Sequence, residues 1–187
     1  HDLCRRQRQM CIRDRLLRGG YHVMHWGKTT SKPAKREDQT HRLPICYFSQ
    51  AVSDAEDKEA RKEQIFSYVR SNFSSFLDEQ PDEKPFFYWF GPHNSHRQWT
   101  RGSGKELWGL DPDSLKRKLP EFLPDVPDVR EDIADYLGEA LAWDRMLHEL
   151  LLELKAREKL ENTLIIVSGD HGMPGMPRGK CNLHDFG

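Results

Sequence analysis

The strongest candidates for chemistry are Asp170 and His171, which follow directly on the apolar run of residues 163–169. A near-continuous β-branched run of this length is typical of a fully buried strand in a parallel sheet. In open α/β sheets, ligands bind just outside the carboxyl ends of the strands. A carboxylate and an imidazole at such an end suit a divalent metal. We therefore expect a metal site here, although an aspartate that only caps a following helix would look similar.

Two further runs of strand length also end in ionisable side chains. The aromatic run 85–91 is followed by His93 and His96, and the weakly alternating run 21–26 leads to Lys28. Taken singly, such a lysine usually lies in a solvated turn, and such histidines are often surface residues. If the three strands are parallel neighbours, however, one edge of the sheet collects an ammonium group, imidazoles and the Asp-His pair. That set suits a metal-bound tetrahedral oxyanion, which indicates a sulfate or phosphate ester.

The segments between these runs predict helices. Spacing of three and four residues over 54–79 predicts one helix, and a capping box at Asp128 and Glu131 predicts the start of another that runs to about Lys159. The core side of the first helix comprises Ile65, Phe66, Val69, Phe73, Phe76 and Leu77. The core side of the second comprises Val129, Ile133, Leu137, Leu141, Leu147, Leu151 and Leu154. Alternating strands and helices indicate an α/β fold with a doubly wound parallel sheet.

Residues 92–127 contain five prolines and are expected to form a long loop. Loops of this length often shape a substrate site or act as a lid. Its aromatic and basic side chains either contact the substrate or anchor the loop to the rest of the protein, and the sequence leaves both open. These side chains are Arg97, Trp99, Arg101 and Trp108.

Composition limits the remaining function classes. The 187 residues are 36% hydrophobic and 32% charged, with no apolar stretch near the roughly 20 residues of a membrane span. Residues 1–18 hold six arginines and two aspartates, but this segment resembles translated sequencing-adapter sequence more than a nucleic-acid-binding arm. We expect residues 1–16 to be a non-native arm, and neither nucleic acid nor a membrane as partner. The four cysteines form no metal-binding or redox pair, and whether Cys46 or Cys181 is paired stays open.

The combined motifs resemble the type I sulfatases of the alkaline phosphatase superfamily. The segment from Gly20 to Lys28 resembles a signature strand that ends in Gly-Lys, and Lys84 to His93 resembles the family's Lys-Pro-Phe-Phe and Pro-His segment. Asn162 to Gly172 resembles its Asn-Thr-Leu strand before the metal ligands, and residues 173–183 are similar to the heparan N-sulfatase (sulfamidase)-like branch. The resemblance covers about residues 16–187 and implies an alkaline phosphatase-like core.

The resemblance implies a role for each matching residue. Asp170 and His171 would be ligands of an active-site Ca²⁺, Lys28 would bind the sulfate, and His93 would contact the sulfate or protonate the leaving group. Lys180 would also face the sulfate. His96 is a lesser substrate-binding candidate. In the family the functional histidine is usually the one with a proline two residues later, and here Ser95 stands in place of that proline. The implied substrate is a sulfated small molecule or glycan.

Parts of the family pattern are missing. Thr30 stands where many members have a second sulfate-binding histidine, and no cysteine has the Cys-x-Pro-Ser-Arg context in which formylglycine, the nucleophile, is made. The paired aspartates that complete the metal site have no counterpart before Lys28. We therefore expect residues 17–187 to be part of a sulfatase catalytic domain, incomplete at both ends and inactive alone. The alternatives are a phosphodiesterase or phosphonate hydrolase of the same superfamily, a non-catalytic module that retains the fold, and an unrelated α/β domain.

Overall fold

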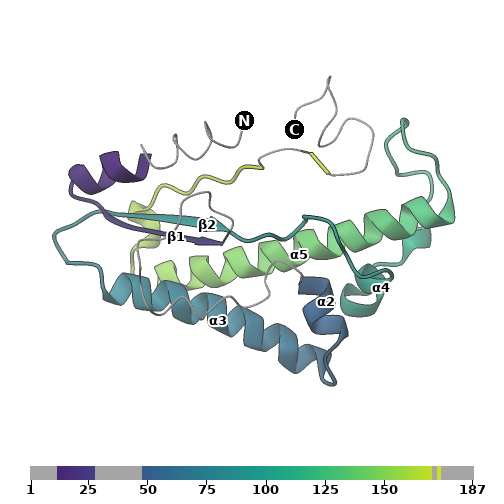
Figure 1. The fold of residues 1–187 in the computed structure, drawn as a ribbon, viewed down its shortest axis with the longest axis horizontal. Coiled ribbons are helices and arrows are strands. Elements are labelled where there is room, and N and C mark those ends of the chain that lie inside the picture. The colour runs from purple at the N-terminus through teal and green to yellow at the C-terminus, as the bar shows by residue number, and fades with distance from the viewer. Residues whose placement is uncertain (1–11, 28–47, 170–171, 174–187) are drawn as a thin grey trace.

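The computed structural model describes residues 12–27, 48–169 and 172–173 and places two parallel strands beside two long helices (Figure 1). Its elements are a helical segment at 12–18, β1 (His22–Gly27), α2 (Phe48–Ser53), α3 (Lys58–Asp78), β2 (Phe86–Gly91), α4 (Ser103–Trp108), a 3-10 turn (Pro112–Leu115), α5 (Pro127–Ala156) and a second 3-10 turn (Leu160–Asn162). Several predicted residues lie outside the described part of the chain: Lys28, Asp170, His171, Lys180 and the four cysteines.

The sheet contains β1 and β2, which pair in parallel from His22 with Phe86 to Gly27 with Gly91. The prediction of two neighbouring parallel strands is confirmed. Alternate residues of β2 face the helices, because Phe86, Tyr88 and Phe90 pack against the core while Trp89 is 38% exposed. Only one face of the described sheet is therefore covered by helices, whereas a doubly wound sheet is covered on both.

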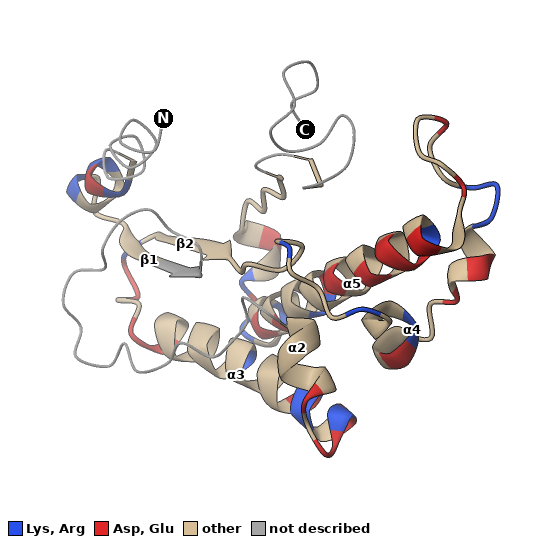
Figure 2. Ribbon diagram, turned by 45° about the vertical axis from the view of Figure 1, so that its right-hand side comes forward, with Lys and Arg blue, Asp and Glu red and all other residues tan. Residues whose placement is uncertain are grey.

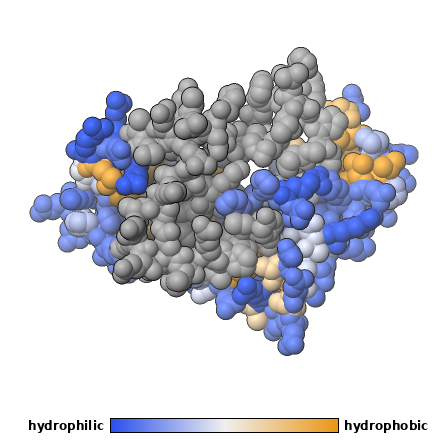
Figure 3. All heavy atoms as spheres, viewed as in Figure 1, coloured by the Kyte–Doolittle hydropathy of each residue, from blue (hydrophilic) through white to orange (hydrophobic). Residues whose placement is uncertain are grey.

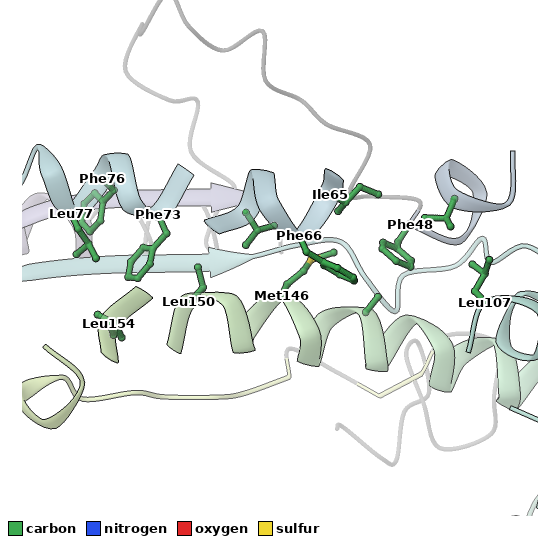
Figure 4. Close-up of a cluster of buried hydrophobic side chains, with 13 residues drawn as sticks. Phe48, Ile65, Phe66, Phe73, Phe76, Leu77, Leu107, Met146, Leu150 and Leu154 are labelled. Atoms are coloured by element: carbon green, nitrogen blue, oxygen red, sulfur yellow. The ribbon is translucent and has the colours of Figure 1, made fainter. Parts of the chain in front are cut away.

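Helix α3 buries the face that its sequence predicts. All six predicted residues are buried, and the rings of Phe73 and Phe76 pack at a tilt against Tyr88 of β2, at centroid distances of 4.7 and 5.0 Å. The helix begins at the N-cap Asp57, whose carboxylate accepts a hydrogen bond from the Ala60 amide. Figure 4 shows the resulting core, in which side chains of α3 meet those of α5 and α2.

Helix α5 lies where its sequence predicts, but the predicted core face is wrong. Of the seven predicted core residues only Leu154 is fully buried, and Leu141 is 39% exposed. The buried face instead holds small or flexible apolar residues and three carboxylates: Ala134, Asp135, Gly138, Glu139, Ala142, Met146, Glu149, Leu150 and Leu154. Small residues occupy this face because α5 lies too close to α4 to leave room for large side chains. A Cβ on Gly104 of α4 would stand 2.2 Å from the carbonyl oxygen of Ala134.

The capping box predicted at Asp128 and Glu131 is also wrong. Helix α5 has Val126 as its N-cap and Pro127 in its first turn, with no side-chain cap. Both carboxylates instead bind Arg101, at 2.8 Å from Asp128 and 2.6 Å from Glu131. Proline suits the first helical turn because its missing amide would have no helical partner there.

Residues 92–127 are not the irregular loop that the sequence predicts, because they contain α4 and a 3-10 turn and are fastened to α5. The two carboxylate oxygens of Asp135 accept hydrogen bonds from the backbone amides of Gly102 and Gly104 at 3.0 and 2.8 Å. Arg130 of α5 binds Asp125 at 2.7 Å. These bonds hold the segment against the helix, so nothing in its packing favours a lid.

The strand predicted at 163–169 is not formed, although the segment follows α5 as expected. It pairs with no strand among the described residues, and its apolar side chains are exposed, with exposed fractions of 86% for Leu164 and 79% for Ile166. In Figure 1 it runs back along the molecule above α5. An apolar run of this kind is buried when it lies within a sheet that is covered by other layers on both faces.

The remaining described surface is mainly hydrophilic. Figure 3 shows polar groups over most of the described atoms on this side, with apolar patches toward the two ends of the molecule. Within the described ranges, no helix is long and apolar enough to cross a membrane.

Candidate active site

The carboxyl ends of β1 and β2 meet at one edge of the sheet. Gly27 and Gly91 are register partners, and each is the last residue of its strand. Lys28 is next in sequence after Gly27, and His93 follows Gly91 by two residues. This is the edge at which ligands bind in open α/β sheets. The structure therefore confirms that β1 and β2 end at the same edge of the sheet. Lys28 itself lies outside the described residues.

His93 and His96 form a tight turn directly after β2. The amide of His96 donates to the carbonyl oxygen of His93 at 2.9 Å. Ser95 has φ = 69°, a left-handed conformation that proline cannot adopt because its ring holds φ near −65°. The serine thus permits a turn that proline at this position would prevent. His93 is half-buried, whereas His96 is exposed and bonds through Nδ1 to the Arg97 carbonyl, so His93 is the better placed at the strand end.

A buried hydrogen-bond network lies behind this turn. The Asn94 side chain donates through Nδ2 to Oε2 of Glu139 at 3.0 Å, and the Ser49 amide donates to Oε1 of the same carboxylate at 2.9 Å. Asn94, Ser49 and Glu139 are 8%, 2% and 3% exposed. The network joins the segment after β2 to α2 and to the middle of α5.

Burial raises the pKa of Glu139 above its ordinary value of 4.5, and the nearby charge of Asp135 adds to that rise. The hydrogen bonds from Ser49 and Asn94 act in the opposite direction, because they stabilise the ionised form. Burial also raises the pKa of Asp135 itself. Two carboxylates with raised pKa values thus lie one helical turn apart on the buried face of α5.

Sequence reasoning missed Glu139 and Asn94. A glutamate in a charged amphipathic helix is usually solvated, so nothing in the local pattern marks Glu139 as buried. Asn94 stands between the two histidines of the candidate segment, and that position was the one available signal. Ser49 lies in a short helix with no pattern of its own.

The candidate metal ligands Asp170 and His171 lie outside the described residues. The segment 163–169 that precedes them is extended and exposed. Across the described residues, no group of three or more His, Cys, Asp or Glu side chains could hold a metal ion. The metal site therefore stays a prediction from the sequence, as does the role of Lys180.

The four aromatic and basic residues of 92–127 all make contacts within the chain. Arg97 forms two 2.7 Å bonds to Asp132 and lies 4.1 Å above the ring of Trp99. Trp108 packs 6.0 Å from the ring of Phe48. Together with the Arg101 ion pairs, these contacts favour the anchoring interpretation over substrate contact.

A shallow cleft of about 340 Å³ lies between α4 and the start of α5. Figure 2 shows charged residues of both signs on α4 and along α5. Arg101, Lys105, Asp111, Asp128 and Glu131 line the cleft, and most are already ion-paired. Of these residues only Arg101 was a candidate for substrate contact, and its charge is already paired with Asp128 and Glu131.

Comparison with known proteins adds a family relationship. A family model described as "Sulfatase" matches residues 4–185. Human N-sulphoglucosamine sulphohydrolase is 31% identical over 127 residues, which is 58% of this chain and 25% of that protein. The "Ulvan-active sulfatase" of Formosa agariphila is 33% identical over 72 residues, 38% of this chain and 12% of that protein. The chain thus spans a quarter or less of either relative, and no solved structure matches it.

Proposed function

The chain belongs to the sulfatase family and resembles N-sulphoglucosamine sulphohydrolase, and from this premise we propose that the complete protein hydrolyses sulfate esters or sulfamates. The observation that carries the proposal is the pairing of Gly27 with Gly91, because it brings two of the three candidate segments to one edge of the sheet. Lys28 and His93 follow these glycines in the sequence.

In the proposed site, Lys28 neutralises charge on the bound sulfate. His93 contacts the sulfate or gives a proton to the leaving oxygen or nitrogen. Lys180 adds a second positive charge, and His96 is a secondary contact at the exposed side of the turn. Fixed cations and proton donors of this kind typically contribute 10²–10³ in rate each, because they stabilise the charge that develops in the transition state.

We place a divalent metal at Asp170 and His171. The Asp170 carboxylate suits Ca²⁺, which prefers oxygen ligands. The imidazole of His171 is more typical of transition metals, so the identity of the metal is part of the proposal that needs a test. When bound, such a cation would polarise the sulfate oxygens. Its remaining ligands would come from outside the described residues.

The proposed complete fold is a doubly wound sheet of alkaline phosphatase type, in which residues 163–169 form a strand. The support is their extended course after α5 and the exposure of Leu164 and Ile166, which a layer covering the face of the complete sheet would bury. The uncovered face of β2, where Trp89 is exposed, would receive a further layer. Residues 17–187 would then be one part of the catalytic domain, with residues 1–16 as a non-native arm.

The nucleophile is expected outside these 187 residues, since none of the four cysteines has the sequence context for formylglycine. We therefore propose that this chain alone does not turn over sulfate esters. The relatives' names mention a sulfated glucosamine and ulvan, and the proposed substrate of this protein is a sulfated sugar.

The test is hydrolysis by the complete protein of three substrates matched in size: an N-sulfated glucosamine and an O-sulfated glucosamine, followed by sulfate release, and a sugar phosphodiester, followed by release of its alcohol. The proposal predicts release from at least one sulfated sugar at a kcat/KM at least 100-fold above that for the phosphodiester. Preference for the phosphodiester would instead support the phosphohydrolase alternative. Absence of turnover on all three, with a folded and metal-loaded protein, would support a non-catalytic module.

A further inference from the structure

The carboxylate of Glu139 lies next to the segment that carries His93. Oε2 accepts from Nδ2 of Asn94 at 3.0 Å, and Asn94 is the residue directly after His93. Oε1 accepts from the amide of Ser49 at 2.9 Å. Both oxygens of the carboxylate are thereby used, one for α2 and one for the turn at the end of β2.

Ser49 also holds the segment after this turn, at Thr100. Its hydroxyl oxygen accepts the backbone amide of Thr100 at 3.1 Å. The segment 93–100 is therefore held near both of its ends, by Glu139 through Asn94 and by Ser49 at Thr100. Asn94, Ser49 and Glu139 are buried, so little water competes for the bonds to the Glu139 carboxylate, whereas the Thr100 bond is only partly buried.

Keeping a carboxylate in this place is costly. Among the ion pairs of the described residues none involves Glu139, although Glu149 on the same helix is paired with Arg70 and Arg145. A buried carboxylate without a countercharge destabilises the fold, and a buried ionisable group with a shifted pKa is a candidate for a specific role. The carboxylate differs from a glutamine in that both its oxygens only accept, so it dictates which way the Asn94 amide must point.

We propose that Glu139 is a positioning residue, which holds His93 at the strand end by fixing the orientation of Asn94. This inference rests on the proposed function, because it assigns Glu139 a task only if His93 acts on the substrate. The competing interpretation is that Glu139 merely ties α5 to α2 and contributes to stability alone.

The chain offers an exchange of partners that separates the two interpretations. In Asn94→Asp, two carboxylates face each other and the bond is lost. In the double variant Asn94→Asp with Glu139→Gln, the glutamine amide donates to the new aspartate, and the bond is restored with its direction reversed. Glu139→Gln alone retains the link as well, because Asn94 can rotate its amide and offer Oδ1, which has no partner in the structure.

The experiment measures kcat and KM of the complete protein on the best sulfated substrate, together with urea unfolding of each variant. Positioning predicts that Asn94→Asp lowers kcat about 100-fold with KM changed less than about threefold, since a displacement near 1 Å can have this effect. The double variant should recover kcat to within about tenfold of the wild type. Asn94→Ala, which removes the donor without adding charge, should also lower kcat if Asn94→Asp fails to fold.

Glu149→Gln is the matched control, because Glu149 is equally buried on the same helix and contacts neither Asn94 nor Ser49. It should reduce stability and leave kcat and KM within about twofold. The inference is overturned if the Asn94 variants unfold more easily but keep kcat, or if the double variant folds without recovering it. A wild-type protein without sulfatase turnover would instead overturn the proposed function, and this inference with it.

Discussion

Gly27 and Gly91 are paired across the two parallel strands, and each ends its strand. The pairing fixes where the chain leaves the sheet, because parallel strands in register end at one edge. The residues that follow them, Lys28 and His93, are those that the sulfatase resemblance assigns to the substrate. The proposed site is built on this edge of the sheet, with α4 and α5 behind it and residues 163–169 expected to complete it.

Replacing Lys28 by alanine in the complete protein should lower kcat/KM about 100-fold, because a fixed positive charge on the sulfate is lost. Lys84→Ala is the control, since Lys84 is an exposed lysine that precedes β2 at the opposite end of the sheet. It should leave kcat/KM unchanged within twofold. Steady-state kinetics on a sulfated sugar measures both, and equal effects of the two variants would remove Lys28 from the site.

Gly104→Ala should destabilise the packing of α4 on α5. The new methyl group would stand 2.2 Å from the Ala134 carbonyl, and overpacking against backbone costs about 3 kcal/mol or more of unfolding free energy. Gly109→Ala is the control, because Gly109 has φ = 68° but open space around its Cβ position, so only backbone strain of about 1–2 kcal/mol applies. Urea unfolding compares the two. A smaller loss for Gly104→Ala than for Gly109→Ala would contradict the close approach of the helices.

The raised pKa of Glu139 predicts a pH-dependent stability difference between the wild type and Glu139→Gln. Below about pH 4.5 the carboxyl group is protonated in both the folded and the unfolded protein and contributes no difference. As the pH rises from about 4.5 to the higher folded-state pKa, the unfolded chain gives up the proton while the buried group keeps it, so the wild type loses stability relative to the glutamine variant. The loss is about 1.4 kcal/mol for each unit by which the pKa is raised.

Urea unfolding at a series of pH values from 4 to 8 measures this difference. Most other groups titrate alike in the two proteins and cancel, and Asp135 is the neighbouring carboxylate whose charge couples to Glu139. A wild type that gains stability over the variant as the pH rises would show that the hydrogen bonds from Ser49 and Asn94 outweigh burial.

Ile166→Lys should hardly change the stability of the 187-residue chain but should strongly destabilise the complete protein. In the 187-residue chain the side chain is 79% exposed, so the unfolding free energy should change by less than about 0.5 kcal/mol. In the complete protein, where we propose that residues 163–169 form a buried strand, the buried ammonium group should cost about 3 kcal/mol or more. Thermal or urea unfolding of both proteins provides the comparison. Tolerance of lysine in the complete protein would show that the segment stays on the surface.

The sequence was sufficient where a residue's environment follows from its immediate neighbours. The buried face of α3 was predicted residue by residue because large aromatic and aliphatic side chains recur at helical spacing with charges between them. The run at 86–90 was equally clear, and its alternation decides which residues face α3.

Prediction failed where partners distant in sequence decide the outcome. On α5, the sequence favoured the largest apolar residues, yet the close approach of Gly104 selects Ala134 and Gly138 for the buried face. Glu139 is buried because Ser49 and Asn94, which lie 90 and 45 residues away, supply its hydrogen bonds. The run 163–169 has the composition of a buried strand, but its burial requires a sheet around it with layers on both faces, and no spacing within the run provides them.

The most direct test of the account is metal-dependent sulfate release by the complete protein and by its Asp170→Asn variant. The account predicts that chelation abolishes release from a sulfated sugar and that one divalent cation, tried as Ca²⁺, Mn²⁺ and Zn²⁺, restores it. Asp170→Asn should lower kcat/KM at least 100-fold and weaken binding of that cation measured by calorimetry. Sulfate release that persists after chelation and is unaffected by Asp170→Asn would contradict the proposed site.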